Sequence, residues 1–165
     1  MDSLFRAHYL SPIGTIEIMA TPTAIVSVLF TEEEPETLAP DLPACLTDCL
    51  LQLSEYFAGD RKVFSLPLAS AGTPFQEQVW HQLSKIDYGK TVSYYDLSVQ
   101  LGNLSAIRAV GSANGKNKIL LIRPCHRVIG ADGQPVGYAG GLWRKKWLLA
   151  HERKINGTHQ LTLFG

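Results

Sequence analysis

Residues 93–113 read SYYDLSVQLGNLSAIRAVGSA, and this stretch predicts two short helices joined by a tight turn. Ser93 is a favourable N-cap residue, and Gly102 followed by asparagine is a typical helix end. Ser105 can begin a second helix that runs to about Ala113. A pair of helices with so short a connection is typical of the helix-turn-helix motif. The second half of the chain is therefore expected to contain one.

The sequence on both sides of this motif predicts more helix. TPFQ at 73–76 combines an N-cap threonine, a proline at the first helical position and a capping-box glutamine. Residues 119–122 are expected to form a buried segment and 130–133 a turn. A last helix is predicted from Leu142 to about Arg153, with cations near its end and a loosely held tail after it.

The first 72 residues have a different pattern. Short runs rich in β-branched residues at 5–10, 15–20 and 25–30 predict a β-meander, and 63–68 a further strand. Leucines at helical spacing predict a helix over 44–57. The fold class is therefore α+β. A small meander-plus-helix subdomain, residues 1–72, is expected to pack on a mostly helical domain, residues 73–165.

Composition places limits on the partner and the compartment. The net charge is zero, but residues 1–72 carry three basic and ten acidic residues, whereas residues 73–165 carry twelve and five. The second half can therefore face a polyanion such as DNA. Only three cysteines occur, and no apolar stretch is long enough to cross a membrane, so a reducing, cytoplasmic location and no membrane partner are expected.

One cysteine stands in a chemically unusual context. Cys45 and Cys49 fit the common role of small buried residues. Cys125, in contrast, follows a proline and precedes His126 and Arg127, which would favour the thiolate if they lay close to the sulfur. Adjacency in sequence does not establish that contact. The residues by themselves indicate a reactive thiol and a structural cysteine about equally.

Residues 73–153 resemble the O6-alkylguanine-DNA alkyltransferases, also called methylated-DNA–protein-cysteine methyltransferases. PCHRV at 124–128 matches that family's active-site signature. Five further blocks follow the family pattern in the right order: TPFQEQVW, YGKTVSYYDL, IRAVGSANGKNK, GYAGG and RKKWLLAHE. The first 72 residues match more loosely, through SPIG and EYFAG.

The resemblance implies DNA repair by irreversible transfer of one alkyl group from O6-alkylguanine to Cys125, without a cofactor. O4-alkylthymine is a second candidate substrate. In the family the motif histidine takes the thiol proton through a water and a glutamate of the last helix orients it; these roles fall on His126 and Glu152. This is the logic of a catalytic triad with a bridging water.

The resemblance also implies how DNA is held. The protein is expected to act as a monomer on double-stranded DNA, to enter the minor groove with its second motif helix and to rotate the damaged base into a pocket. Arg108 would fill the gap left by the base, Tyr94 would contact the base, and Asn117 would join the helix to the active-site segment. The remaining DNA- and base-binding residues implied are Ala109, Arg127, Val128, Tyr138 and Ala139.

Some features depart from the family pattern. Ala139 stands where some relatives have serine, so backbone N–H groups would have to bind the guanine oxygen. Arg123 stands where an aliphatic residue is common. Cys45 and Cys49 have no histidine pair nearby, so no metal site is predicted.

Two other functions fit parts of this pattern. A cysteine hydrolase could use Cys125, His126 and Glu152, but no oxyanion loop is recognisable. A non-catalytic helix-turn-helix protein could bind alkylated DNA without chemistry. Because binding-only relatives lack the cysteine, Cys125 favours transfer over this alternative.

Overall fold

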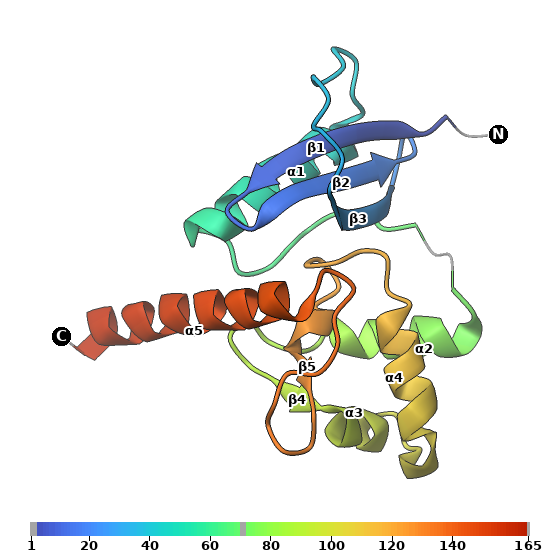
Figure 1. Cartoon of the computed structure of the whole chain (residues 1–165), viewed down its shortest axis with the longest axis vertical. Coiled ribbons are helices and arrows are strands. Elements are labelled where there is room, and N and C mark those ends of the chain that lie inside the picture. The colour runs from blue at the N-terminus through green and yellow to red at the C-terminus, as the bar shows by residue number, and fades with distance from the viewer. Residues whose placement is uncertain (1–2, 70–71, 165) are drawn as a thin grey trace. The chain divides into compact units, whose positions relative to one another are not determined.

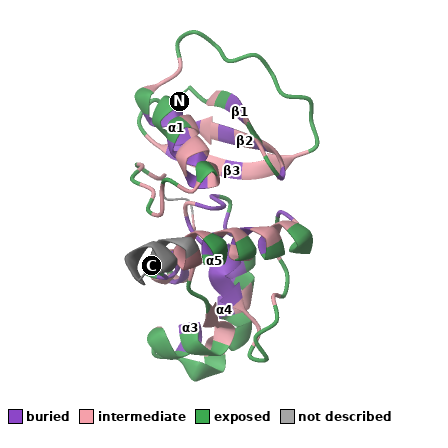
Figure 2. Ribbon diagram, turned by 90° about the vertical axis from the view of Figure 1, so that its left-hand side faces the viewer, coloured by how far each residue is buried: buried purple, intermediate pink, exposed green. Residues whose placement is uncertain are grey.

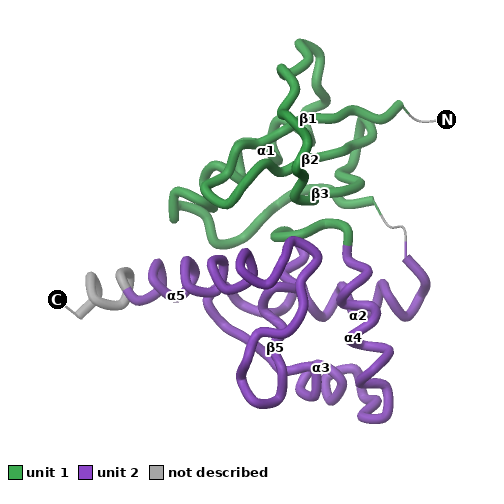
Figure 3. Tube along the Cα trace, viewed as in Figure 1, with its two compact units in different colours: residues 1–71, 118–122 green, residues 72–117, 123–165 purple. Residues whose placement is uncertain are grey.

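The computed structural model describes residues 3–69 and 72–164, with only the backbone of 158–164. The chain divides into two compact units, 1–71 with 118–122 and 72–117 with 123–165 (Figure 3). Strands of one unit and helices of the other confirm the α+β class (Figure 1). Among the described residues no helix is both long and apolar enough to span a membrane.

The first unit is built on a three-stranded antiparallel sheet in the order β1-β2-β3. The strands are β1 (Phe5–Ser11), β2 (Gly14–Ala20) and β3 (Ile25–Thr31), so the predicted meander is confirmed. Gly14 has φ 117°, which favours glycine, and the Ser11 hydroxyl donates to its carbonyl at 2.6 Å. These two residues close the tight β1–β2 turn, which is formed by Pro12 and Ile13.

Helix α1 (Ala44–Ala58) packs on β1 and β2. It ends at Gly59, whose φ of 85° turns the chain so that the Asp60 N–H donates to the Glu55 carbonyl at 2.8 Å. The apolar faces of sheet and helix make the core of this unit, which Figure 2 shows as buried. Its fully buried side chains include Ile18, Ile25, Val28, Leu46, Leu53 and Tyr56.

The remaining edge of the sheet is covered by a segment distant in sequence. The Val28 N–H donates to the Lys118 carbonyl at 2.9 Å, and the Leu120 N–H donates to the Val28 carbonyl at 3.0 Å. Residues 119–121 are buried, in agreement with the prediction of a buried segment there. The strand predicted over 63–68 is wrong: only Leu68 bridges to β3, at Ile25.

The second unit contains the helix-turn-helix. Helix α2 (Pro74–Leu83) has the predicted capping box between Thr73 and Gln76 and packs on α4 (Ile107–Gly115). Helix α3 (Tyr94–Gln100) starts with a second capping box, between Ser93 and Asp96. A short 3-10 turn, η1 (Leu104–Ala106), leads into α4, so this helix begins at Ile107 and not at Ser105 as expected.

A long final helix and a short parallel pair complete the second unit. Strand β4 (Val92–Ser93) pairs with β5 (Val128–Ile129), which directly follows the 3-10 turn η2 (Cys125–Arg127). Helix α5 spans Leu142–Phe164, so the helix continues through the tail that was expected to be loosely held. The parallel pair and α5 position the active-site segment.

Candidate active site

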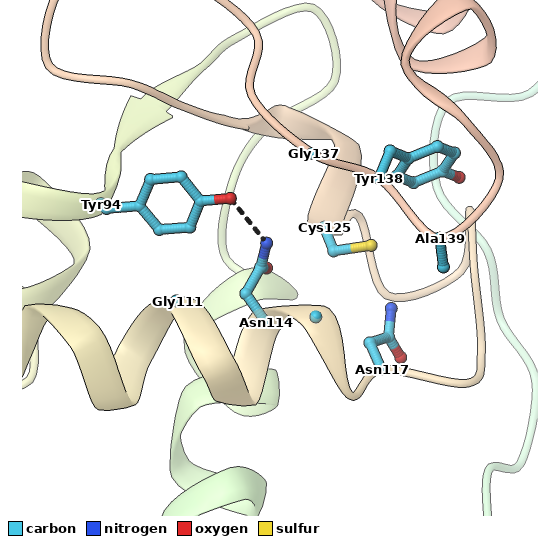
Figure 4. Close-up of a pocket in the computed structure, with 9 residues that line it drawn as sticks. Tyr94, Gly111, Asn114, Asn117, Cys125, Gly137, Tyr138 and Ala139 are labelled. Atoms are coloured by element: carbon cyan, nitrogen blue, oxygen red, sulfur yellow. Dashed lines mark hydrogen bonds between the residues drawn. The ribbon is translucent and has the colours of Figure 1, made fainter.

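Cys125 lies at the start of η2 and is buried, with 4% of its surface exposed. It lines a pocket of about 240 Å³ whose walls come from α3, α4 and the loop before α5 (Figure 4). The pocket is lined by Tyr94, Gly111, Asn114, Gly115, Asn117, Cys125, Gly137, Tyr138 and Ala139. The structure thus brings together the cysteine and four other residues singled out in the sequence: Tyr94, Asn117, Tyr138 and Ala139.

Asn117 ties the end of α4 to the active-site segment. Its Nδ2 atom donates to the Arg123 carbonyl at 3.1 Å, two residues before Cys125. A hydrogen bond from Asn117 also counteracts the rise in the pKa of the Cys125 thiol. Asn117 therefore holds the chain that carries the sulfur and contributes to the environment of the sulfur itself.

His126 and Glu152 form a buried pair. His126 Nε2 lies 2.7 Å from Glu152 Oε2, and both side chains are at most 1% exposed. With the Nε2 hydrogen shared with the carboxylate, the Nδ1 atom of the neutral ring is left as a hydrogen-bond acceptor. No described residue is a hydrogen-bond partner of Nδ1. The pair can therefore accept a proton at Nδ1 and stabilise the resulting charge through Glu152.

Arg127 is not placed as the sequence suggested. Its guanidinium is buried and binds Glu152 through two nitrogens, at 2.8 and 3.0 Å, and donates to the Ile86 carbonyl at 2.8 Å. Its side chain is thus engaged within the protein, and the expectation that Arg127 binds DNA or the base stays a prediction. A buried bidentate ion pair fixes the carboxylate that holds His126, so Arg127 is a positioning residue.

The electrostatics of the site differ from what adjacency to His126 and Arg127 suggested. Burial raises the pKa of Cys125 to about 11, although Asn117 and Lys145 act against the rise. Burial also lowers the pKa of His126, despite the neighbouring carboxylate. The resting site therefore holds a neutral thiol and a neutral imidazole, because desolvation outweighs the nearby charges.

Glu152 is held as a carboxylate. Burial by itself raises the pKa of this group, but its interactions with His126 and Arg127 outweigh burial and bring the pKa well below the usual range. Glu152 also accepts the backbone N–H of Gly89 at 3.1 Å. The negative charge is thus available to orient His126 over the whole physiological pH range.

Lys145 is a part of the site that sequence reasoning missed. Its side chain is fully buried in α5, and Nζ donates to the carbonyls of Val136 and Gly137 at 3.0 Å each. Burial lowers its pKa to about 8, and Cys125 acts against that shift. The sequence signal was its spacing: Lys145, Leu148 and Glu152 lie on one face of the helix.

The residues expected to bind DNA are divided between the pocket and the surface. Arg108 and Ala109 are exposed on α4 and do not line the pocket. Tyr138 lines it, and its ring meets the His126 ring edge-on, with 6.5 Å between centroids. The Val128 side chain is completely buried in β5, so a base contact by this residue would have to use its backbone.

Arg123, the residue that departed from the family pattern, is also buried. Its guanidinium carbon lies 4.5 Å from the centre of the Trp80 ring. The Trp80 indole in turn donates to the Ala113 carbonyl at 2.8 Å, which joins α2 to α4. Arg123 therefore contributes to packing behind the site, through a cation–π contact.

One group of potential metal ligands, His8, Glu17 and Glu33, lies in the first unit. The Glu36 N–H donates to His8 Nδ1 at 3.1 Å. In the neutral ring this bond places the hydrogen on Nε2, the atom that faces Glu17 at 3.7 Å. A metal would need the Nε2 lone pair with a hydrogen on Nδ1, so this donor set does not fit a metal ion.

Fold and site together define a helix-turn-helix protein with a buried cysteine–histidine–glutamate group beside a pocket. Two family models match the chain: the 6-O-methylguanine DNA methyltransferase DNA binding domain over residues 74–154 and the ribonuclease-like domain of the same proteins over 4–70. The chain belongs to the 6-O-methylguanine DNA methyltransferase family.

Individual relatives agree with this assignment. The chain is 46% identical to a methylated-DNA–protein-cysteine methyltransferase of Shigella flexneri over 78% of the chain and 74% of that protein. It is 41% identical to the one of Mycolicibacterium paratuberculosis over 93% of the chain and 94% of that protein. A solved Mycobacterium tuberculosis O6-methylguanine methyltransferase has a TM-score of 0.82 at 39% identity, covering 92% of this chain and 94% of that one. A structure of Mycobacterium tuberculosis OGT in complex with DNA has the same TM-score at 40% identity, with the same coverage of both chains.

Proposed function

We propose that this protein repairs DNA by transferring an alkyl group from the O6 atom of guanine to Sγ of Cys125, once per molecule. One observation carries the proposal: Cys125 lines a pocket in the helix-turn-helix unit and directly precedes the buried His126–Glu152 pair. Its DNA-binding family domain and its DNA-bound structural relative make DNA the partner.

The chemistry balances with the groups present. The Cys125 sulfur attacks the alkyl carbon, a C–S bond forms, and the bond between that carbon and the guanine oxygen breaks. The thiol proton passes toward Nδ1 of His126 and is finally returned to the released guanine, so both products are neutral. No oxidant, reductant or co-substrate is required. Because a thioether is a poor leaving group, the reaction stops after one transfer.

The high pKa of Cys125 means that transfer needs a proton acceptor. A thiol with a pKa of about 11 is rarely ionised at neutral pH, so transfer requires removal of its proton as the sulfur attacks. His126 is kept neutral by burial and is thus ready to accept that proton, and Glu152 stabilises the imidazolium that forms. Arg127 holds Glu152 in place for this task.

The mode of DNA binding is part of the proposal. The target atom of a paired guanine lies inside the base stack, and the pocket around Cys125 is recessed, so the nucleotide must be rotated out of the duplex. Exposed small residues on α4, including Ala109, allow a close approach to the minor groove, and exposed Arg108 can fill the vacated space. Action as a monomer is part of the same proposal. A free thiol nucleophile supports a reducing, cytoplasmic location.

Mass spectrometry tests the reaction directly. After incubation with an oligonucleotide containing O6-methylguanine, the protein should gain one methyl group, mapped to Cys125, and no more. Cys125→Ser should abolish the gain, because a hydroxyl is far less nucleophilic than a thiolate. Cys45→Ser, in α1 of the other unit, is the matched control and should behave as the unmodified protein. Methylation elsewhere, or repeated turnover, contradicts the proposal, and binding without transfer would support a non-catalytic function.

A further inference from the structure

The second unit has a further pocket, which we call the α5 groove. It has a volume of about 350 Å³ and shares no lining residue with the pocket that contains Cys125. One wall is α5, and the opposite wall is the loop between β5 and α5 (Figure 1). All of its lining residues belong to the second unit. None of them has a part in the proposed transfer reaction, so the groove calls for a separate explanation.

Helix α5 has two adjacent faces with different roles. One face carries side chains with no exposed surface, among them Lys145 and Glu152 of the active site. The next face lines the α5 groove through residues spaced three and four apart, Lys146, Leu149, Ala150 and Arg153. Leu149 is half-buried, whereas both cations are exposed. Because seven residues separate Lys146 from Arg153, the two cations lie about 10 Å apart along the helix axis.

The rest of the α5 groove is mostly apolar and held in place by local hydrogen bonds. Ile129 of β5 and Pro135 of the loop line it, and both are half-buried. The Gly130 N–H donates to the Gln134 carbonyl at 2.8 Å, and the Gly133 N–H donates to the Gly130 carbonyl at 3.0 Å. These bonds close the loop on itself. The wall therefore has a defined shape without a ligand, as is usual for binding pockets.

The α5 groove combines this aliphatic floor with positive charge. In the part of the chain that the structure describes, neither Lys146 nor Arg153 forms an ion pair. Exposed Thr91 adds a hydroxyl at the edge, and none of the lining residues is aromatic. A nucleic acid would leave the aliphatic floor uncovered, and its bases would find no aromatic side chain to stack on. The groove thus fits an anionic ligand with an aliphatic part.

We infer that the α5 groove is a docking site for a short acidic segment of a partner protein. Aliphatic side chains of the segment pack on Ile129 and Leu149, and the acidic side chains on either side of them bind Lys146 and Arg153. In an extended peptide the distance between the two cations corresponds to about three residues, at about 3.3 Å each. A segment in which acidic residues flank two leucines has this spacing. Because the groove and the Cys125 pocket share no residue, partner binding and methyl transfer can take place on the same molecule.

Three synthetic peptides test the chemistry of the ligand. A fluorescently labelled peptide GSEELLEESG should bind the full chain at low ionic strength, as measured by fluorescence anisotropy. GSQQLLQQSG lacks the carboxylates and GSEESSEESG lacks the aliphatic side chains, so each should bind about tenfold more weakly or worse. Added salt should weaken binding of the first peptide, because its ion pairs are near the surface. No binding of the first peptide, or equal affinity for all three, overturns the inference.

Variants at exposed positions locate the site without removing buried contacts. Lys146→Ala combined with Arg153→Ala should weaken binding of the first peptide by about tenfold. Ala150→Glu places a carboxylate in the groove between the two cations and should abolish binding. The control combines Lys85→Ala with Lys118→Ala, which removes the same charge from exposed positions outside the groove, and should retain the affinity. If the groove variants bind as the control does, the peptide binds elsewhere and the inference is wrong.

Two further measurements distinguish an acidic peptide from other occupants of the groove. The double variant at Lys146 and Arg153 should bind an undamaged DNA duplex as tightly as the charge-matched control does. A loss of duplex affinity beyond that of the control would make the groove a nucleic-acid site and overturn the inference. Sedimentation velocity should show the same species for the unmodified protein and the groove variants. Self-association that the groove variants abolish would make a second copy of this chain the occupant, which also overturns the inference.

Discussion

His126 Nε2 lies 2.7 Å from Glu152 Oε2, in a place where neither side chain is more than 1% exposed. The same carboxylate accepts hydrogen bonds from two guanidinium nitrogens of Arg127 and from the backbone N–H of Gly89. Glu152 therefore connects α5, η2 and the loop before β4. Its loss should affect both the reaction and the stability of the second unit.

Glu152→Gln should lower the free energy of unfolding by about 3–5 kcal/mol, because it leaves the Arg127 charge buried without its counter-charge. Urea unfolding monitored by tryptophan fluorescence measures this change. The matched control is Glu55→Gln, which removes the carboxylate of a partly exposed ion pair with Arg61 and should cost less than about 1 kcal/mol. Similar losses in the two variants would mean that the buried network adds no special stability.

The difference between Glu152→Gln and the unmodified protein should depend on pH. Because its neighbours depress the pKa of Glu152 in the folded protein, its stabilisation is complete above the unfolded pKa of about 4.3 and decreases as the pH falls below that value. Unfolding curves at a series of pH values should therefore show a difference that is constant near neutrality and shrinks in acid. A difference that grows in acid would reverse the assigned sign of the pKa shift.

Alkylation of Cys125 by iodoacetamide should be slow at neutral pH. Burial raises its pKa to about 11, so the thiolate fraction and the rate should rise by about tenfold per pH unit in the neutral and mildly alkaline range. Peptide mapping by mass spectrometry follows each cysteine separately. Cys49, with a pKa raised to about 12, should react more slowly still. A Cys125 rate that is already constant near neutrality would indicate a resting thiolate.

Lys145→Met should loosen the loop 136–141, because methionine fills the space of the lysine but cannot donate to the carbonyls of Val136 and Gly137. Amide hydrogen exchange in that loop should accelerate by about tenfold or more, and methyl transfer should slow in parallel. Lys146→Met changes the adjacent exposed lysine and should alter neither. Unchanged exchange in Lys145→Met would show that the loop is held by other contacts.

Arg108→Ala should separate base rotation from chemistry. If Arg108 fills the gap that the rotated base leaves in the duplex, its loss should slow repair of double-stranded DNA by about one to two orders of magnitude, since unstacking costs a few kcal/mol. Reaction with free O6-benzylguanine, if the pocket admits that group, needs no rotation and should change little. The slowing of repair on single-stranded DNA should be intermediate between that on the duplex and that on the free base.

Lys85→Ala removes an exposed positive charge after α2 and serves as the control for net charge in the Arg108 experiment. It should leave the ratio of duplex rate to free-base rate unchanged. Equal slowing of both reactions in Arg108→Ala would mean that the residue supports the fold. No slowing of either would assign base rotation to another residue of α4.

The sequence by itself determined the local structure. Capping boxes at Thr73 and Ser93 and the glycine at position 59 begin and end helices through hydrogen bonds that span only a few residues, so their signals are readable in one dimension. The meander and the helix-turn-helix were also predictable, because each is made of short segments joined by turns that are close together in the sequence. The strand expected over 63–68 failed because a mainly apolar run forms a strand only where a partner pairs with it, and only Leu68 bridges to β3.

Only the tertiary structure decided what the buried polar groups do. Arg127 and Glu152 are 25 residues apart in the chain, and Gly89 and Glu152 are 63 apart, so no local pattern relates them. Adjacency suggested that Arg127 acts on Cys125, whereas in the folded chain its guanidinium binds Glu152. The pKa of the Cys125 thiol and the pKa of the buried Lys145 ammonium likewise depend on desolvation. Desolvation is set by which distant residues close around a group, and only the folded chain determines that.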